Sequence, residues 1–84
     1  MLFYVYILQS QVDGSFYIGY SNEVERRLAE HNAGLSRYTS KKIPWIIFYV
    51  EEFANKSEAI KRERFLKRQR NHEFYLRLKK EKEG

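Results

Sequence analysis

The sequence contains no cysteine, only one proline and only four glycines. Without cysteine, the chain can form neither a disulfide framework nor a zinc site with thiolate ligands, and two histidines, His31 and His72, are too few to replace such a site. No apolar run approaches the roughly 20 residues that a membrane span requires, and no basic leader opens the chain. We therefore expect a cytosolic, monomeric protein without a membrane anchor.

The length of 84 residues allows one small domain and no second core. Apolar residues make up 43% of the chain, and seven Tyr, six Phe and one Trp among them supply large side chains for a core. Neither repeats nor a linker divide the sequence. We predict one domain over residues 1–84, with residues 81–84 frayed.

Positive charge is concentrated in the second half of the sequence. Residues 1–55 hold five basic and six acidic side chains, a balance of −1, whereas residues 56–84 hold eleven basic and five acidic ones, a balance of +6. A field of this kind attracts polyanions, and phosphate backbones are the usual partner. A solvated helix with surplus lysine explains the charge equally well.

A β-hairpin is predicted at the N-terminus. The apolar and aromatic run Leu2–Leu8 and the run Ser15–Tyr20 are rich in strand formers, and Asp13-Gly14 lies between them as a turn signal. If these two residues form the loop, Tyr17 lies opposite Ser10 and Gly19 lies opposite Leu8. Tyr6 then shares one face of the hairpin with Tyr17 and Gly19.

A helix and a third strand follow the hairpin. Asn22 is a candidate N-cap for a helix over residues 22–33, which Gly34 ends. Residues 34–44 mix Gly, Ser, Thr, Lys and Pro and predict a mobile loop. The continuous apolar run Trp45–Val50 predicts a strand that is covered on both faces.

Two further helices complete the chain. Asn55 is a candidate N-cap for a helix that runs to about Arg70, and Asn71 separates it from a shorter helix from His72 to about Lys80. The order is β-β-α-β-α-α. We predict an α+β fold in which helices flank a small three-stranded antiparallel sheet.

Glu63 occupies an unusual position on the second of these helices. Its neighbours Ala59, Ile60 and Leu66, at spacings of one helical turn, place the carboxylate on the apolar stripe. Because an unpaired buried charge costs several kcal/mol, the carboxylate requires an arginine or a metal ion. A salt bridge to a nearby arginine, or a place at the edge of the stripe, remains an alternative.

Arg27 stands one helical turn from both Glu23 and His31. An ordinary surface pair with Glu23 would explain its position without any function. Tyr6 and Tyr17 are likewise explained by packing in a sheet when each is taken alone. Their occurrence together with Arg27 and Glu63, in this order, is more informative.

From Leu2 to about Arg70 the chain resembles the GIY-YIG nuclease superfamily, in particular its small standalone members. The two motifs stand here as Tyr4-Val5-Tyr6 and Tyr17-Ile18-Gly19, with Tyr4 in place of the first glycine. Arg27 matches the arginine of the helix after the second motif, and Glu63 matches the metal-binding glutamate of the helix after the third strand. The resemblance implies a GIY-YIG-like fold and hydrolysis of phosphodiester bonds.

The resemblance also implies a role for each matched residue. Glu63 is expected to anchor one Mg²⁺ or Mn²⁺, and Arg27 to hold the phosphate and assist Tyr6. Tyr6 is expected to position or deprotonate the attacking water, and Tyr17 to contact the phosphate or orient the water. His31, where some relatives have Tyr, is expected to supply a proton or a phosphate contact, although a structural cap is an alternative.

Basic side chains beyond these residues are expected to grip the nucleic-acid backbone, DNA in preference to RNA, without reading its sequence. They are Lys41, Lys61, Arg62, Arg64, Lys67, Arg68 and Arg70. Tyr38 lies with Lys41 in the predicted mobile loop, from which both side chains can reach the substrate, but no specific role is assigned to Tyr38. Three interpretations stay open: a metal-dependent endonuclease of low sequence specificity acting in DNA repair or recombination, a nucleic-acid-binding module beside a protein partner that supplies specificity, and an interaction domain unrelated to nucleic acid.

Overall fold

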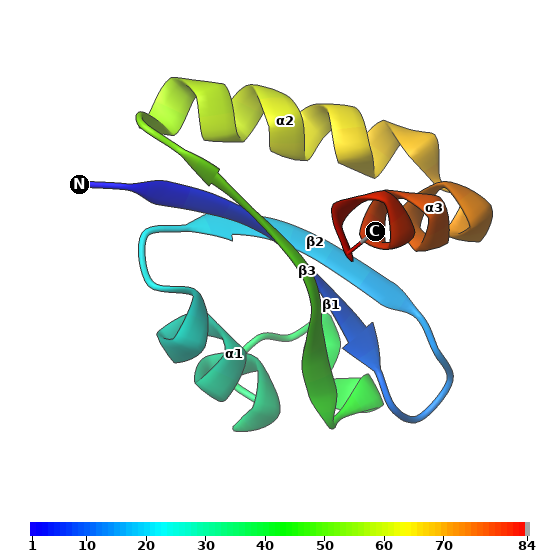
Figure 1. Cartoon of the computed structure of the whole chain (residues 1–84). Helices are drawn as coiled ribbons and strands as arrows, with labels where there is room; N and C mark the ends of the chain where they lie inside the picture. The colour runs from blue at the N-terminus through cyan, green and yellow to red at the C-terminus, as the bar shows by residue number, and fades with distance from the viewer. Residues whose placement is uncertain (84) are drawn as a thin grey trace.

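The computed structural model describes residues 1–83. In chain order its elements are β1 (Phe3–Ser10), β2 (Phe16–Ser21), α1 (Val24–Asn32), the short 3₁₀ helix η1 (Thr39–Lys42), β3 (Trp45–Phe53), α2 (Lys56–Gln69) and α3 (His72–Glu83). The strands form one antiparallel sheet in the order β2-β1-β3 (Figure 1). The predicted α+β fold and its β-β-α-β-α-α order are confirmed, and η1 is added within the segment predicted to be a loop.

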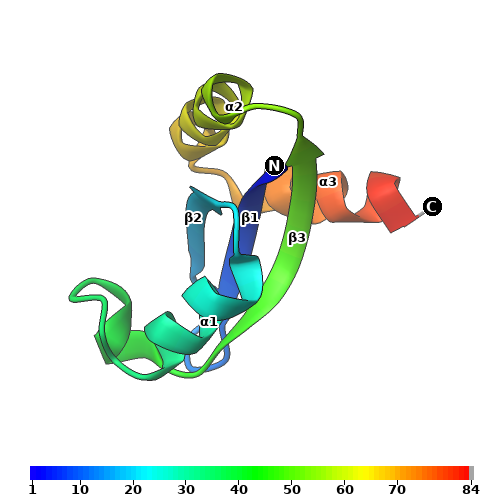
Figure 2. The ribbon, with the colours of Figure 1, turned by 90° about the vertical axis from the view of Figure 1, so that its left-hand side faces the viewer.

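Helices cover both faces of the sheet (Figure 2). Side chains of the central strand β1 alternate between the two layers: Val5 and Ile7 pack under α2 and α3, whereas Tyr6 and Leu8 pack on the side of α1 and Trp45. All four β1 side chains are buried. The unbroken apolar run of β1 therefore reflects burial on both faces, as the sequence predicts.

The hairpin register differs from the prediction by two residues. Tyr6 faces Gly19, and Leu8 faces Tyr17, because the connection runs from residue 11 to residue 15 and is longer than Asp13-Gly14 alone. Within it, the Gly14 N–H donates to the Ser10 carbonyl, and Gly14 has a positive φ of 78° that glycine adopts readily. A shift of two residues leaves every side chain on its predicted face, so Tyr6, Tyr17 and Gly19 still share one face.

β3 is longer than predicted and contains an irregularity opposite Ile7 and Leu8. Ile7 pairs with Tyr49, whereas Leu8 pairs with Ile47, so one residue of β3 is left without a partner. As a result Phe48 and Tyr49, although adjacent, both pack into the core under α2 and α3.

The ends of the helices follow the predictions only in part. Asn55 caps α2 by accepting a hydrogen bond from the Glu58 N–H, as predicted. Asn22 does not cap α1, because α1 begins at Val24 and the Ser21 hydroxyl accepts from the Glu23 N–H. α3 is helical through Glu83, and residue 84 lies outside the described residues, so the fraying of residues 81–84 stays a prediction.

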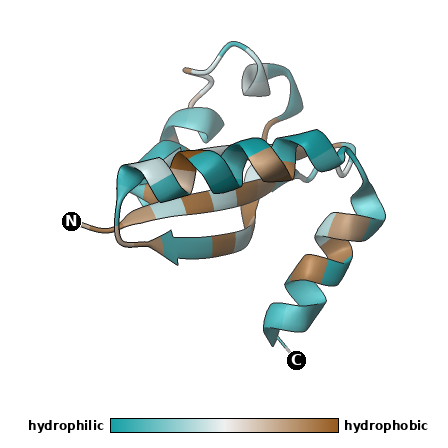
Figure 3. Ribbon diagram, turned by 90° about the horizontal axis from the view of Figure 1, so that it is seen from above, coloured by the Kyte–Doolittle hydropathy of each residue, from teal (hydrophilic) through white to brown (hydrophobic). Residues whose placement is uncertain are grey.

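The outward surface of α2 is largely hydrophilic (Figure 3). Its buried side chains, Ala59 and Leu66, lie on the opposite side against the sheet. None of the helices within residues 1–83 is long and apolar enough to cross a membrane.

Candidate active site

Tyr6 and Gly19 form a tight pair across β1 and the edge strand β2. A Cβ atom on Gly19 would lie 2.5 Å from the Tyr6 hydroxyl oxygen and 2.7 Å from Cζ, so the ring passes directly over Gly19. The Tyr6 residue is 1% exposed. Gly19 thus provides the space in which the Tyr6 hydroxyl is held.

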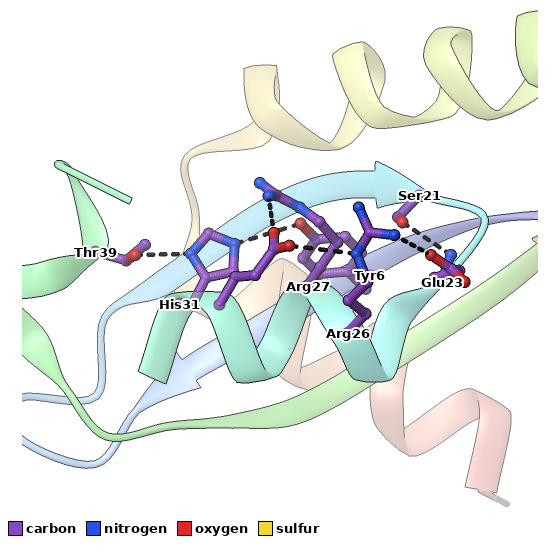
Figure 4. A network of polar contacts seen from close by, with 8 residues as sticks. Tyr6, Ser21, Glu23, Arg26, Arg27, His31 and Thr39 are labelled. Carbon is purple, nitrogen blue, oxygen red and sulfur yellow. Dashed lines mark hydrogen bonds and ion pairs between the residues drawn. The ribbon is translucent and has the colours of Figure 1, made fainter. Parts of the chain in front are cut away.

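A buried chain of polar contacts continues from Tyr6 (Figure 4). The Tyr6 hydroxyl lies 3.5 Å from His31 Nε2, and His31 Nδ1 lies 2.7 Å from the Thr39 hydroxyl. The Thr39 carbonyl accepts a hydrogen bond of 2.9 Å from Trp45 Nε1. η1 therefore fixes the orientation of the His31 ring from the side opposite Tyr6.

The C-terminal end of α1 is also tied to the sheet. The Asn32 side chain accepts from the Trp45 N–H at 2.7 Å and donates to the Trp45 carbonyl at 3.0 Å. His31, the preceding residue, is thereby held at 0% exposure between α1 and η1. A residue that only capped the helix would not need these contacts, because both ring nitrogens of His31 face side-chain hydroxyls.

The surroundings of this cluster shift the pKa of both Tyr6 and His31. Burial lowers the pKa of His31 below its ordinary value of 6.5, and the nearby Arg27 charge lowers it further. Burial raises the pKa of Tyr6 above its ordinary value of 10.0; Arg27 opposes the shift, while Tyr17 and Glu63 add to it. At neutral pH we therefore expect a neutral imidazole facing a protonated phenol.

Arg27 and its neighbours form ion pairs along α1 that differ from the predicted surface pair. Arg26, rather than Arg27, contacts Glu23, at 2.7 Å. Arg27 Nη1 lies 2.5 Å from a Glu30 carboxylate oxygen, and Arg26 reaches the other oxygen of Glu30 (Figure 4). The nearby Tyr6 hydroxyl is the largest influence that raises the pKa of Arg27, and the Glu30 carboxylate raises it as well, so the guanidinium lies close to both groups.

Glu63 reaches the same region from α2, in the other layer. Its side chain is 13% exposed, and its ion-pair partner is Lys67, at 3.4 Å. Its charge acts on the Tyr6 hydroxyl, which places the carboxylate within electrostatic range of the cluster. Glu63 thus lies near the edge of the apolar stripe on which it was predicted. Its ion-pair partner is Lys67, one helical turn away, instead of an arginine.

The carboxylate of Glu63 suits Mg²⁺ or Mn²⁺, which need few protein ligands, better than a metal ion whose ligands all come from the protein. Residues 1–83 contain no group of three or more His, Cys, Asp or Glu side chains arranged to bind a metal ion. Mg²⁺ commonly uses one or two carboxylates and keeps water in its other positions. A largely buried carboxylate whose ion-pair partner is a single lysine fits that pattern.

Tyr17 lies next to the buried cluster at the β2 edge. Its ring centroid is 4.8 Å from that of His31 and 5.9 Å from that of Tyr38. Tyr38 precedes η1 and is 66% exposed. Tyr17 therefore connects the buried cluster to an exposed aromatic ring for which the sequence predicts no role.

The predicted phosphate-gripping residues lie in different surroundings. Arg64 and Arg68 are exposed on α2, Lys41 lies in η1 beside Arg37 and Tyr38, and Lys61 pairs weakly with Glu58 at 3.8 Å. Lys67 and Arg70 line a cleft. Arg62 differs from the others, because its Nε and Nη2 donate to the two oxygens of Glu51 at 2.8 and 2.9 Å. This pairing gives Arg62 a structural role in the fold, and its contact with nucleic acid stays a prediction.

Two site residues, Gly19 and Thr39, received no role from the sequence. Thr39 lies in the segment predicted to be mobile, yet it is 0% exposed and hydrogen-bonded to His31. Gly19 belongs to the motif Tyr17-Ile18-Gly19 and lies on the same predicted face of the hairpin as Tyr6. This shared face is the feature of the sequence that could have indicated its packing against Tyr6. Nothing local in the sequence marks Thr39.

The fold and this arrangement of residues define the class of protein. A family model for the GIY-YIG catalytic domain matches residues 2–79. The chain therefore belongs to the GIY-YIG family, which is a family of nucleases.

Similar proteins carry the name UPF0213. The chain is 46% identical over 79 residues to a UPF0213 protein of Enterococcus faecalis, covering 88% of this chain and 89% of that one. It is 44% identical over 68 residues to a UPF0213 protein of Streptococcus pneumoniae, covering 80% and 68%. A solution NMR structure of the UPF0213 protein BH0048 from Bacillus halodurans is 34% identical, with a TM-score of 0.56 and coverage of 93% of this chain and 82% of that one.

Proposed function

We propose that this protein is a metal-dependent endonuclease that hydrolyses DNA phosphodiester bonds with low sequence specificity. The observation that carries the proposal is the hydrogen-bonded path from Thr39 through His31 to Tyr6, bordered by the cation Arg27 and the carboxylate Glu63. Hydrolysis needs a proton acceptor, a cation for the phosphoryl oxygens and a means to stabilise the leaving oxygen. Each need has a residue in this cluster.

His31 is better suited than Tyr6 to be the final proton acceptor. Its pKa is lowered by burial, so the imidazole is neutral at pH 7, whereas the raised pKa of Tyr6 makes its phenolate scarce. If His31 Nδ1–H donates to Thr39, Nε2 is free to accept the Tyr6 proton. Tyr6 then takes a proton from the water as it passes its own to His31.

In the resulting step the water oxygen forms a bond to phosphorus while the bond from phosphorus to the 3′ oxygen breaks. The water proton passes to Tyr6, and solvent water protonates the departing 3′ oxygen. Arg27 holds the phosphoryl oxygens as negative charge grows on them. Its pair with Glu30 is partly exposed, so exchanging that carboxylate for a phosphate costs little.

Glu63 is the residue that would hold a divalent ion, for which its largely buried carboxylate is suited. When bound, such an ion stabilises the charge on the leaving oxygen. The Lys67 side chain is 51% exposed, so its ammonium group is free to swing away from Glu63 when a metal ion replaces it.

The residues of the candidate site do not distinguish one base sequence from another. We therefore expect the protein to bind its substrate through the phosphate backbone. The exposed cations of α2 and η1 contact phosphates and carry no sequence information. A role in DNA repair or recombination fits such a nuclease. A catalytically weak nucleic-acid-binding module is the second candidate, and the 1% exposure of Tyr6 favours it, because a buried hydroxyl is a poor contact for water.

Cleavage of labelled duplex, branched and single-stranded DNA with Mg²⁺ or Mn²⁺ tests the proposal. Glu63→Gln is compared with Glu58→Gln, which removes the same charge from the same helix at an exposed position. Nicking that EDTA and Glu63→Gln abolish, and that Glu58→Gln preserves, supports the nuclease. Salt-dependent binding without nicking by the wild type would refute turnover and leave the binding module.

A further inference from the structure

The cleft that Lys67 and Arg70 line lies beside Tyr17 of the candidate active site. Its lining comes from β2, from the end of α2 and from the start of α3, and Figure 1 shows how α2 passes into α3. The volume of the cleft is about 490 Å³, and Tyr6, Arg27 and Glu63 do not line it. Its floor is apolar, formed by Phe16, Ile18 and Tyr75. Tyr17 lines both this cleft and the candidate active site.

The rim of this cleft carries basic residues. Lys67, Arg70 and His72 line it, and within residues 1–83 neither Arg70 nor His72 makes an ion pair. The Lys67 ammonium lies 3.4 Å from Glu63, which connects the rim to the candidate metal ligand. Anionic groups bound here would sit one helical turn from Glu63.

Arg70 occupies a backbone position that normally favours glycine. It follows α2 with φ 45° and ψ 42°, the left-handed conformation in which helices often end with glycine. A side chain other than glycine or asparagine is held there against a conformational cost. The cost is understandable if the guanidinium has a ligand in the cleft.

Tyr38 completes the lining of the cleft. Its ring, 66% exposed, stands 5.9 Å from Tyr17 with an interplanar angle of 36°. Exposed aromatic rings next to cations are the surface on which unpaired bases stack in single-strand-binding proteins. Tyr38 also lines a basic hollow with Arg37, Lys41 and Lys42, so cations flank the ring on both sides.

We propose that this cleft binds one unpaired nucleotide of the substrate strand, with its base against Tyr38 and Tyr17 and its phosphate on Lys67, Arg70 and His72. The volume lies within the range of about 300–1,000 Å³ that is usual for small-ligand sites. A cleft of this volume is too small to hold duplex DNA. The inference rests on the proposed function and narrows its substrate to nucleic acid with unpaired nucleotides beside the scissile bond.

Binding without cleavage tests this inference. Fluorescein-labelled DNA is titrated in EDTA as a blunt duplex, as a duplex with an unpaired extension and equal phosphate number, and as a single strand. We expect tighter binding of the two DNAs with unpaired nucleotides. Tyr38→Ala should weaken that binding about fivefold or more, change the affinity for the blunt duplex less than about twofold, and be rescued by Tyr38→Phe. Parallel RNA oligonucleotides distinguish a DNA site from an RNA site.

Arg70→Ala should reduce the slope of log affinity against log salt for single strands by about 0.7, the value for one lost phosphate contact. Arg77→Ala is the matched control, since Arg77 is exposed on α3, carries the same charge and does not line the cleft. Arg70→Gly removes the same side chain while relieving the backbone, which excludes misfolding as the cause.

Equal affinity for blunt and extended duplexes, or identical behaviour of the Arg70 and Arg77 variants, would overturn the cleft assignment even if cleavage depends on Glu63. Conversely, a preference for unpaired nucleotides in EDTA that requires Tyr38 and Arg70 supports the cleft even if no substrate is cut. The two proposals therefore fail separately.

Discussion

Replacing Gly19 by alanine tests the packing on which the Tyr6 hydroxyl depends. An alanine Cβ would lie 2.5 Å from the hydroxyl oxygen and 2.7 Å from Cζ, and Tyr6 is fixed by a core that includes Leu8 and Trp45. Overpacking of this kind costs about 1–3 kcal/mol. Alanine in a strand instead gains about 0.5–1 kcal/mol over glycine. The difference is a net loss in the free energy of unfolding of at most about 2.5 kcal/mol, and of about 1 kcal/mol at the middle of the two ranges.

Urea unfolding followed by the fluorescence of Trp45, the single tryptophan, measures this loss. Repeating the substitution in a Tyr6→Leu background provides the control, because leucine removes both clashing atoms. There we expect Gly19→Ala to be neutral or stabilising. We also expect it to abolish cleavage in the wild-type background, since the hydroxyl leaves its place 3.5 Å from His31. A Gly19→Ala protein as stable as the wild type in both backgrounds would show that the pair is not tightly packed.

Three further predictions concern the groups around this pair. Because burial lowers the folded-state pKa of His31, the unfolded state binds more protons below about pH 6.5; stability should fall as pH drops through that value, and urea unfolding of His31→Gln should show a smaller fall. Thr39→Val removes the hydroxyl from His31 Nδ1 at constant shape and should cost about 1–3 kcal/mol in the same assay, whereas an unchanged midpoint would place the imidazole elsewhere. Arg62→Ala leaves Glu51 without its bidentate partner and should cost about 1–2 kcal/mol while the salt dependence of DNA binding stays as in the wild type; a reduced slope would show that Arg62 also contacts nucleic acid.

The features that the sequence predicted well are those set by neighbours along the chain. The Asn55 cap and the alternation of β1 side chains depend on spacings of three and two residues, and both are present. The register of the hairpin failed because it depends on how the turn closes. The Ser10 carbonyl accepts a hydrogen bond from the Gly14 N–H, and the Asp13 carboxylate accepts one from the Ser15 N–H. These bonds close a connection that is longer than two residues. Asp-Gly alone did not reveal this.

The candidate site shows the same division. Resemblance to a family located Tyr6, Arg27 and Glu63, but the partners of these residues come from tertiary packing. Helical spacing allowed Arg27 to pair with Glu23. In the structure Arg26 forms the ion pair with Glu23, and Arg27 lies close to Glu30 and Tyr6. Thr39 meets His31 only because η1 folds against α1, a contact that periodicity does not encode.

The site divides into a buried half and an accessible half, and this division determines what substitutions reveal. Tyr6 and His31 are at most 1% exposed, so changes there remove packing and hydrogen bonds together with any chemistry. Glu63 and Arg27 retain solvent contact, with side chains 13% and 38% exposed, and ion pairs of this kind contribute at most about 1 kcal/mol. A loss of cleavage at unchanged stability is therefore informative for the accessible half. For the buried half, the pH dependence of cleavage and the matched double variants must separate catalysis from folding.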